Sequence, residues 1–231
     1  MFGFMFGFGY LSTTDEYKVV MGAEMFSSNK GSWKRIQVPP CSVGQSCGVF
    51  SSGALHWLLY SCDQKQQVPN LYAFDLEKEE FWMMKLPDAL QTLGLVRSSI
   101  SYQLGVTREG CLYVMVQSEV WDSGKLASFY VVDFWVMRDY DNSDSWTKSL
   151  GVKISNQPAR RDWFLSIEAI SVSETSAFVR NTYAAVEQGE LMSTIYHRNE
   201  ESSRMYILEN GAQSMVVYEE SYHVVLIQHE A

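Results

Sequence analysis

Four histidines are the side chains of this chain best suited to proton transfer near neutral pH: His56, His197, His223 and His229. A hydrolase would need one of them beside a serine nucleophile and a carboxylate, an arrangement that forms only in space. The final His-Glu-Ala of the sequence lacks the second histidine of the H-E-x-x-H zinc motif. We therefore expect no catalytic residue and interpret His56, which precedes Trp57, as a packed strand residue.

Acidic side chains gather in two segments, residues 75–81 and 198–204. A glycosidase needs two carboxyl groups on facing strands of a cleft, whereas both segments are typical of solvated turns between strands. The glycines of residues 3–9 are not followed by the lysine of a phosphate-binding loop. The cysteines form no C-x-x-C pair, which disfavours a zinc site and predicts reduced thiols at Cys41, Cys47, Cys62 and Cys111. The sequence therefore predicts no metal and no cofactor.

The composition favours a globular, acidic protein. Hydrophobic residues make up 46% of the 231 residues and charged residues 19%, which is enough apolar material for a sizeable core. The formal net charge of −9 repels phosphate backbones and argues against a nucleic-acid partner. This charge either keeps the surface soluble or suits a basic partner. The apolar start, MFGFMFGFGY, has no signal-peptide features and is too short to span a bilayer, so we expect a soluble intracellular protein without a membrane partner.

Short apolar or alternating segments dominate the chain and are separated by turn residues, a pattern typical of an all-β fold. Helical signal is confined to residues 88–96. Many short strands at even spacing predict a sandwich, a barrel or a propeller. We expect strands at residues 17–22, 23–28, 33–38, 47–52, 54–61, 70–76, 80–87, 101–107, 111–118, 127–137, 145–150, 164–172, 176–181, 190–198, 204–210, 214–220 and 222–228.

One pattern occurs twice along the chain. The segments GVFSSGALHWL (48–58) and GVTREGCLYVM (105–115) share Gly-Val-x-x-x-Gly-x-Leu followed by aromatic side chains. The second glycine of each copy, Gly53 or Gly110, suits a turn that requires positive φ. An eroded third copy has Ser176 in the place of this glycine. The recurrence predicts a chain built from structural repeats.

Each repeat is interpreted as a small antiparallel sheet with apolar side chains on both faces, which must pack against neighbouring sheets. We therefore predict an all-β, propeller-like array of about four antiparallel sheets, open or incomplete, over a single domain of residues 1–231. In this array Trp57 and Tyr113 occupy equivalent places between sheets, and His56 points to the opposite face.

Two loops are the best candidates for binding a partner. The segment SEVWDSGKL carries Trp121, and NQPARRDWF carries Arg160, Arg161 and Trp163. Tryptophan and arginine are enriched at binding hot spots, and loops on a rigid scaffold commonly carry function. The competing interpretation is that both tryptophans pack beneath their own loops. We predict these four residues as a partner-binding surface.

The order of several segments resembles the plant F-box-associated domain. The resemblance is carried by FGFGYLSTTDEYKVV, FSSNKGSWKRI, GVFSSGALHWL and LYAFDLEKEEFWMMKLPD; it is dense over residues 6–88, fair over 101–150 and loose beyond. Members of that family carry an F-box before a kelch-like propeller region. Here no F-box precedes FGFGY, and YKVVMG runs almost directly into AEMFSS, where members usually have a longer insertion.

The resemblance implies a substrate-recognition subunit of a Skp–cullin–F-box ubiquitin ligase, which has no enzymatic activity of its own and acts in the cytoplasm or nucleus. Its partner would be a target protein, and an acidic chain suits a basic target. A Skp-type adaptor would bind only if an F-box exists upstream. Two alternatives stay open: a truncated, non-functional remnant, and a carbohydrate-active or hydrolytic propeller enzyme with convergent carboxylates.

Overall fold

The computed structural model describes residues 5–43, 47–61, 68–90, 100–122, 127–155, 163–173, 176–185, 190–199, 203–208, 212–217 and 224–228. The chain divides into two compact units. The first comprises residues 1–119 and 132–149, and the second comprises residues 120–131 and 150–231. The expectation of a single domain over residues 1–231 stays a prediction.

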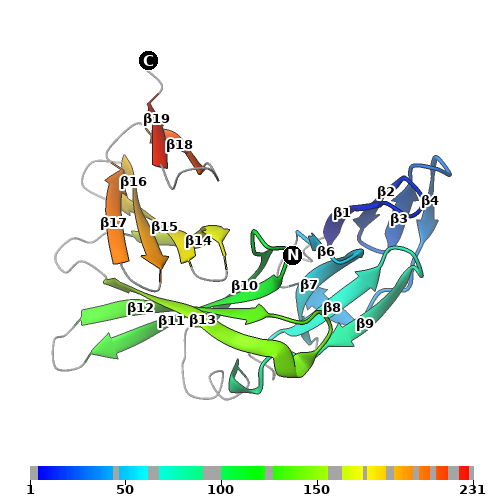
Figure 1. Ribbon diagram of the computed structural model, residues 1–231, viewed down its shortest axis with the longest axis horizontal. Coiled ribbons are helices and arrows are strands. Elements are labelled where there is room, and N and C mark those ends of the chain that lie inside the picture. The colour runs from blue at the N-terminus through cyan, green and yellow to red at the C-terminus, as the bar shows by residue number, and fades with distance from the viewer. Residues whose placement is uncertain are drawn as a thin grey trace. The chain divides into compact units, whose positions relative to one another are not determined.

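The described residues form antiparallel sheets whose strands follow chain order, except that β6 pairs with β7 beside β5 (Figure 1). The first sheet is β1 (Phe6–Leu11), β2 (Glu16–Met21), β3 (Glu24–Ser27) and β4 (Ser32–Arg35). The second is β5 (Cys41–Val43), β6 (Val49–Ser51), β7 (Ala54–Ser61), β8 (Asn70–Asp75) and β9 (Glu80–Met84). The third is β10 (Ile100–Val106), β11 (Leu112–Asp122), β12 (Ala127–Met137) and β13 (Trp146–Ser155).

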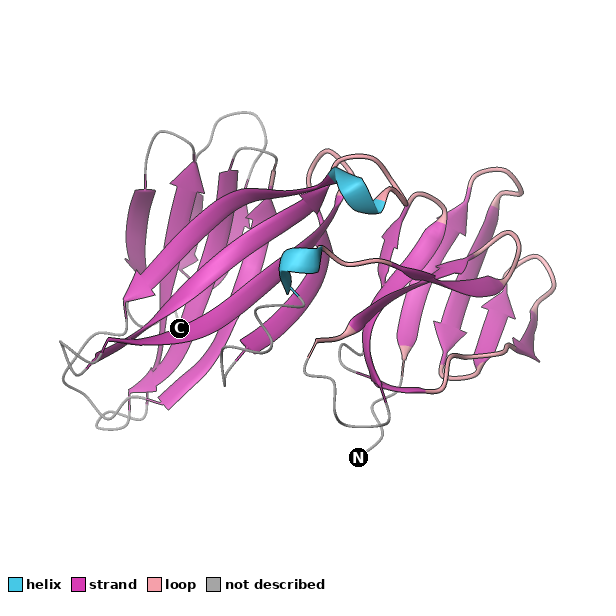
Figure 2. Cartoon of the chain, turned by 90° about the horizontal axis from the view of Figure 1, so that it is seen from below, coloured by secondary structure: helices cyan, strands magenta, loops and turns pink. Residues whose placement is uncertain are grey.

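The rest of the chain follows the same plan. A fourth sheet comprises β14 (Trp163–Val172), β15 (Ser176–Ala185), β16 (Glu190–Asn199) and β17 (Ser203–Leu208), and β18 (Ala212–Val217) pairs with β19 (Val224–Gln228). Helix is confined, among the described residues, to single turns at residues 88–90 and at η1 (Ser143–Ser145), drawn in cyan in Figure 2. The predicted all-β array of about four antiparallel sheets is confirmed. The rest of the helical expectation at 88–96 lies outside the described residues.

Strand β7 shows why both faces of a sheet must be covered. Leu55, Trp57 and Leu59 point toward the first sheet, whereas His56 and Leu58 point toward the third. All five side chains are at most 1% exposed. The prediction that Trp57 and His56 face opposite ways is therefore confirmed, and the adjacent pair reflects a strand with two buried faces.

Two hydrophobic cores cover these faces. The first core lies between the first and second sheets and contains Met5, Leu11, Val20, Met25, Leu55, Trp57, Leu59, Phe74 and Leu76. The second core lies between the second and third sheets and contains Leu58, Val68, Leu71, Ala73, Met84, Leu86, Leu90, Leu104, Leu112, Val114, Val116, Met137 and Trp146.

Strand β1 was not among the predicted strands, because glycines at alternate positions disfavour a strand interior. In the structure these glycines allow close packing of the two sheets. A Cβ atom on Gly7 would overlap Trp57 and Leu55, and one on Gly9 would overlap Leu76 and Phe50. The glycines therefore bring the first sheet against the second. Strand β5 was also missed, being three residues long.

The two strong repeats occupy corresponding places, because each forms the hairpin that leads into the strand second in the order of its sheet, β7 or β11. The turn glycines have positive φ, +77° at Gly53 and +90° at Gly110. The first glycine of each copy has a different role. A Cβ on Gly48 would overlap the ring of Trp57, and one on Gly105 would overlap the ring of Tyr113.

Trp57 and Tyr113 are therefore equivalent because each packs against the first glycine of its own repeat, on the other strand of the hairpin. Their separation along the sequence from the turn glycine is not the same. Trp57 follows Gly53 by one residue more than Tyr113 follows Gly110, because the two hairpin loops differ in length. In the third copy, Ser176 opens β15, and its backbone N–H donates to Ser173 Oγ over 3.0 Å.

We predict that Gly48→Ala lowers the free energy of unfolding by about 1–3 kcal/mol. The new methyl group would overlap the ring of Trp57, which is fully buried and closely packed. Urea denaturation measures the loss. Thr13→Ala, in an exposed turn, serves as the matched control and should leave the transition unchanged. A Gly48→Ala midpoint equal to that of the parent chain would contradict the packing argument.

Candidate functional site at the hairpin turns of the first unit

Four turns of the first unit surround a pocket of about 800 Å³. They are the turn between β1 and β2, the β6–β7 hairpin, the turn between β8 and β9, and the loop between β12 and β13. The residues that line the pocket are Tyr10, Leu11, Ser12, Thr13, Phe50, Ser52, Gly53, Ala54, Asp75, Glu77, Lys78, Glu80, Phe81, Trp82, Tyr140 and Asp141. The pocket is therefore built from segments that are far apart in the sequence.

The turn between β8 and β9 is shaped by Asp75. Its carboxylate accepts hydrogen bonds from the backbone N–H groups of Glu77 (2.8 Å) and Lys78 (2.9 Å). Burial opposes ionisation of Asp75, but these backbone donors and the Lys78 ammonium outweigh it, so the pKa of Asp75 is lowered. The ionised carboxylate therefore stabilises the turn. The last turn residue, Glu79, has a positive φ of 61°. Glu77 and Lys78 are thereby presented to solvent.

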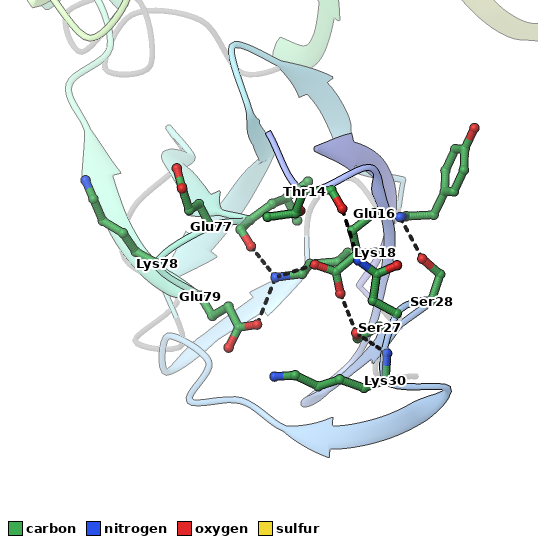
Figure 3. Close-up of polar contacts among 12 residues, drawn as sticks. Thr14, Glu16, Lys18, Ser27, Ser28, Lys30, Glu77, Lys78 and Glu79 are labelled. Carbon is green, nitrogen blue, oxygen red and sulfur yellow. Dashed lines mark hydrogen bonds and ion pairs between the residues drawn. The ribbon is translucent and has the colours of Figure 1, made fainter. Parts of the chain in front are cut away.

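A buried lysine joins this turn to the first sheet (Figure 3). Lys18 Nζ donates to the backbone carbonyl of Leu76 at 2.6 Å and to Glu79 Oε1 at 2.8 Å, and Glu16 Oε2 lies 3.6 Å away. Ser27 donates to Glu16, and this hydrogen bond, assisted by Lys18, lowers the pKa of the Glu16 carboxyl group. The ion pairs hold one wall of the pocket in place.

His56 holds Tyr140, which lines another part of the pocket. Tyr140 Oη lies 2.8 Å from His56 Nε2, and His56 Nδ1 lies 3.1 Å from the carbonyl oxygen of Val49. A neutral ring that donates from Nδ1 to Val49 and accepts from Tyr140 satisfies both contacts. Burial lowers the pKa of His56 to about 4 and raises that of Tyr140. Since both ring nitrogens are occupied, His56 positions the loop that carries Tyr140.

The pocket surface combines aromatic rings with acidic groups. Tyr10 and Phe50 are 37% and 39% exposed. Trp82 Nε1 donates to Asp141 Oδ1 at 3.3 Å, which joins β9 to the loop between β12 and β13. Glu77 and Glu80 are exposed. This arrangement favours a binding surface for a partly apolar, positively charged group.

None of the residues that line the pocket is among the predicted partner-binding residues. Trp121 belongs to β11, near its end, and not to a loop. Trp163 opens β14, where its backbone pairs with Ala184. Arg160 and Arg161 lie outside the described residues. The binding role of these four residues stays a prediction.

Among the other sequence candidates, His197 lies in β16, and His223 and His229 lie outside the described residues. Within the described part of the chain, no three histidine, cysteine, aspartate or glutamate side chains are grouped closely enough to hold a metal ion. None of the helices in that part is long and apolar enough to cross a membrane.

The pocket itself was missed by the sequence reasoning. The acidic segment 75–81 was recognised as an exposed turn, and it does form one wall. No regular spacing in the sequence links the aromatic residues of the pocket, because three different hairpins supply Tyr10, Phe50 and Tyr140. A turn flanked by an outward-facing aromatic residue is the one local feature that could have indicated them.

Comparison with known proteins gives a consistent result. A family model described as "F-box associated beta propeller domain" matches residues 3–227. The chain is similar to F-box protein CPR1 of Arabidopsis thaliana, with 29% identity over 182 residues, covering 65% of this chain and 41% of that protein. It is also similar to F-box protein At4g22390 of the same plant, with 24% identity over 172 residues, covering 62% and 39%. The chain thus spans about two fifths of the length of these relatives.

We predict that stability falls as the pH drops from 6.5, the ordinary pKa of histidine, to about 4, the pKa of His56 in the folded chain. In this window the unfolded chain takes up a proton that folded His56 does not, so protonation favours unfolding. The loss for this one group reaches up to about 3 kcal/mol. Urea unfolding at a series of pH values measures it.

The His56→Gln variant is the control, because it removes the titrating group. Its stability should vary less with pH between 4 and 6.5 than that of the parent chain. Acid destabilisation of equal size in the two proteins would show that other groups are responsible.

Proposed function

Because the chain belongs to the F-box-associated β-propeller family, we propose that it is the substrate-recognition part of a Skp–cullin–F-box ubiquitin ligase. The observation that carries this proposal is the family match, which runs over residues 3–227. The similarity to two proteins named as F-box proteins supports it. In such a ligase an F-box contacts a Skp-type adaptor, and the associated domain contacts the target protein.

The chain contributes binding and no catalysis to this assembly. The buried His56 uses both ring nitrogens in structural contacts. A rigid β-scaffold that presents side chains on its turns is well suited to recognising another protein. Ubiquitin transfer would be performed by other subunits, in the cytoplasm or the nucleus.

The target is a protein with a basic surface. The formal net charge of −9 gives the chain a field that attracts positively charged partners and speeds their association. The predicted surface of Trp121, Arg160, Arg161 and Trp163 would provide further contacts at hot-spot residue types.

We predict that residues 1–231 fused to an F-box support polyubiquitination of a protein that they bind. The test is a reconstituted ligase with a Skp-type adaptor, a cullin, and the activating and conjugating enzymes. The substrate is a protein cross-linked to the chain in plant cells, and its ubiquitin ladder is followed by immunoblotting.

The same F-box fused to an unrelated domain is the control and should give no ladder on that protein. Bound proteins that acquire no ubiquitin, and whose abundance does not change when the chain is overproduced, would refute the ligase role.

A further inference from the structure

The pocket at the turns of the first unit carries unbalanced negative charge. Its lining contains four carboxylates and one ammonium group. The ammonium, on Lys78, lies 3.4 Å from Asp75. None of the ion pairs among the described side chains uses Glu77 or Glu80, and both residues are exposed. A positive group that enters the pocket therefore meets two carboxylates that are not already neutralised.

Aromatic rings stand beside these carboxylates. The polar atoms of Tyr140 and Trp82 are already engaged, with His56 and Asp141 respectively. Tyr10 Oη donates to Asp15 at 2.8 Å. The rings therefore contribute apolar surface, and Phe50 adds an exposed ring from the neighbouring hairpin. An arginine suits such walls, because its guanidinium stacks on aromatic faces while its N–H groups pair with carboxylates.

A second hollow borders the same strand, β9. Glu80, Phe81 and Trp82 also line this hollow of about 550 Å³, together with Val38 and Met83. Met83 is 62% exposed. Two hollows that share one strand give room for several residues of an extended segment, with apolar contacts beyond the acidic pocket.

The walls are held before any partner arrives. Asp75 closes the turn between β8 and β9 through two backbone N–H groups. In the loop that carries Tyr140, Ser145 Oγ donates to the carbonyl of Asn142 at 2.7 Å and accepts from the backbone N–H of Asp139 at 3.0 Å. A preformed site loses less conformational entropy on binding than a mobile loop does.

We propose that this pocket binds an arginine side chain of an extended, basic segment of the target protein. The guanidinium pairs with Glu77 and Glu80 between the rings of Tyr10, Phe50 and Trp82, and the flanking residues follow β9. This proposal rests on the proposed function, since it names where and how that target is recognised.

The test uses pools of fluorescent octapeptides of random sequence with one fixed central residue: arginine, citrulline, lysine or glutamate. Citrulline keeps the shape of arginine but has no charge. The full chain should retain the arginine pool at least about fivefold better than each of the other pools, because only arginine offers a charged, bidentate group.

Glu77→Gln with Glu80→Gln should abolish the preference for arginine, and Phe50→Ser should weaken it. The matched control is Glu24→Gln with Asp88→Asn, which removes the same charge at exposed positions outside the lining. This control should bind like the parent chain. Circular dichroism and thermal melting of each variant show that the fold is retained.

Equal retention of all pools, an equal response to lysine and arginine, or an equal loss in the control variant would overturn the proposal. An equal loss in the control variant would show that the peptides bind through the net negative charge of the chain and not through this pocket. Ubiquitination by the F-box fusion, together with no preference among the pools, would refute the pocket and leave the ligase role intact. A selective pocket without ubiquitination would refute the ligase role alone.

Discussion

Burial of both faces of the second sheet is the constraint on which the first unit depends. Trp57 and Phe74 face one core and Leu58 and Leu71 face the other, and all four are at most 1% exposed. Full burial of each such side chain stabilises the fold by about 1.5–3 kcal/mol. A single sheet cannot bury the apolar side chains of both its faces by itself. The sheets therefore stabilise one another, and none is a stable unit alone.

Polar groups buried between the sheets fix how they are aligned. Trp57 Nε1 donates to the carbonyl of Phe6 at 3.0 Å, and Trp146 Nε1 donates to the carbonyl of Lys85 at 2.9 Å. The first bond joins the second sheet to the first residue of β1, and the other joins the third sheet to the residue that follows β9. Apolar packing alone tolerates sliding, whereas a buried N–H that loses its acceptor costs about 1–3 kcal/mol. These tryptophans therefore supply both packing area and register.

The sequence predicted most of the strands because their side-chain patterns are local. It missed β1, since Gly7 and Gly9 have no side chain to form a pattern and their role is to admit residues of another sheet. It recognised the repeat, but not that Gly48 leaves space for Trp57. The pocket could not be predicted because its walls come from four separate turns, and only tertiary packing, such as the contact of His56 with Tyr140, brings them together.

The difference between buried sheet residues and exposed turn residues explains how such a fold can change its binding partner. Substitution of a sheet residue such as Leu58 leaves a cavity between two sheets and destabilises the whole unit. Glu77 and Glu80 contact neither core, so replacing them alters charge at low cost to folding. Asp75 and Lys18 lie between these extremes, because they hold the turn that presents the exposed acids. Specificity can therefore change at the turn tips while the residues beneath keep their geometry.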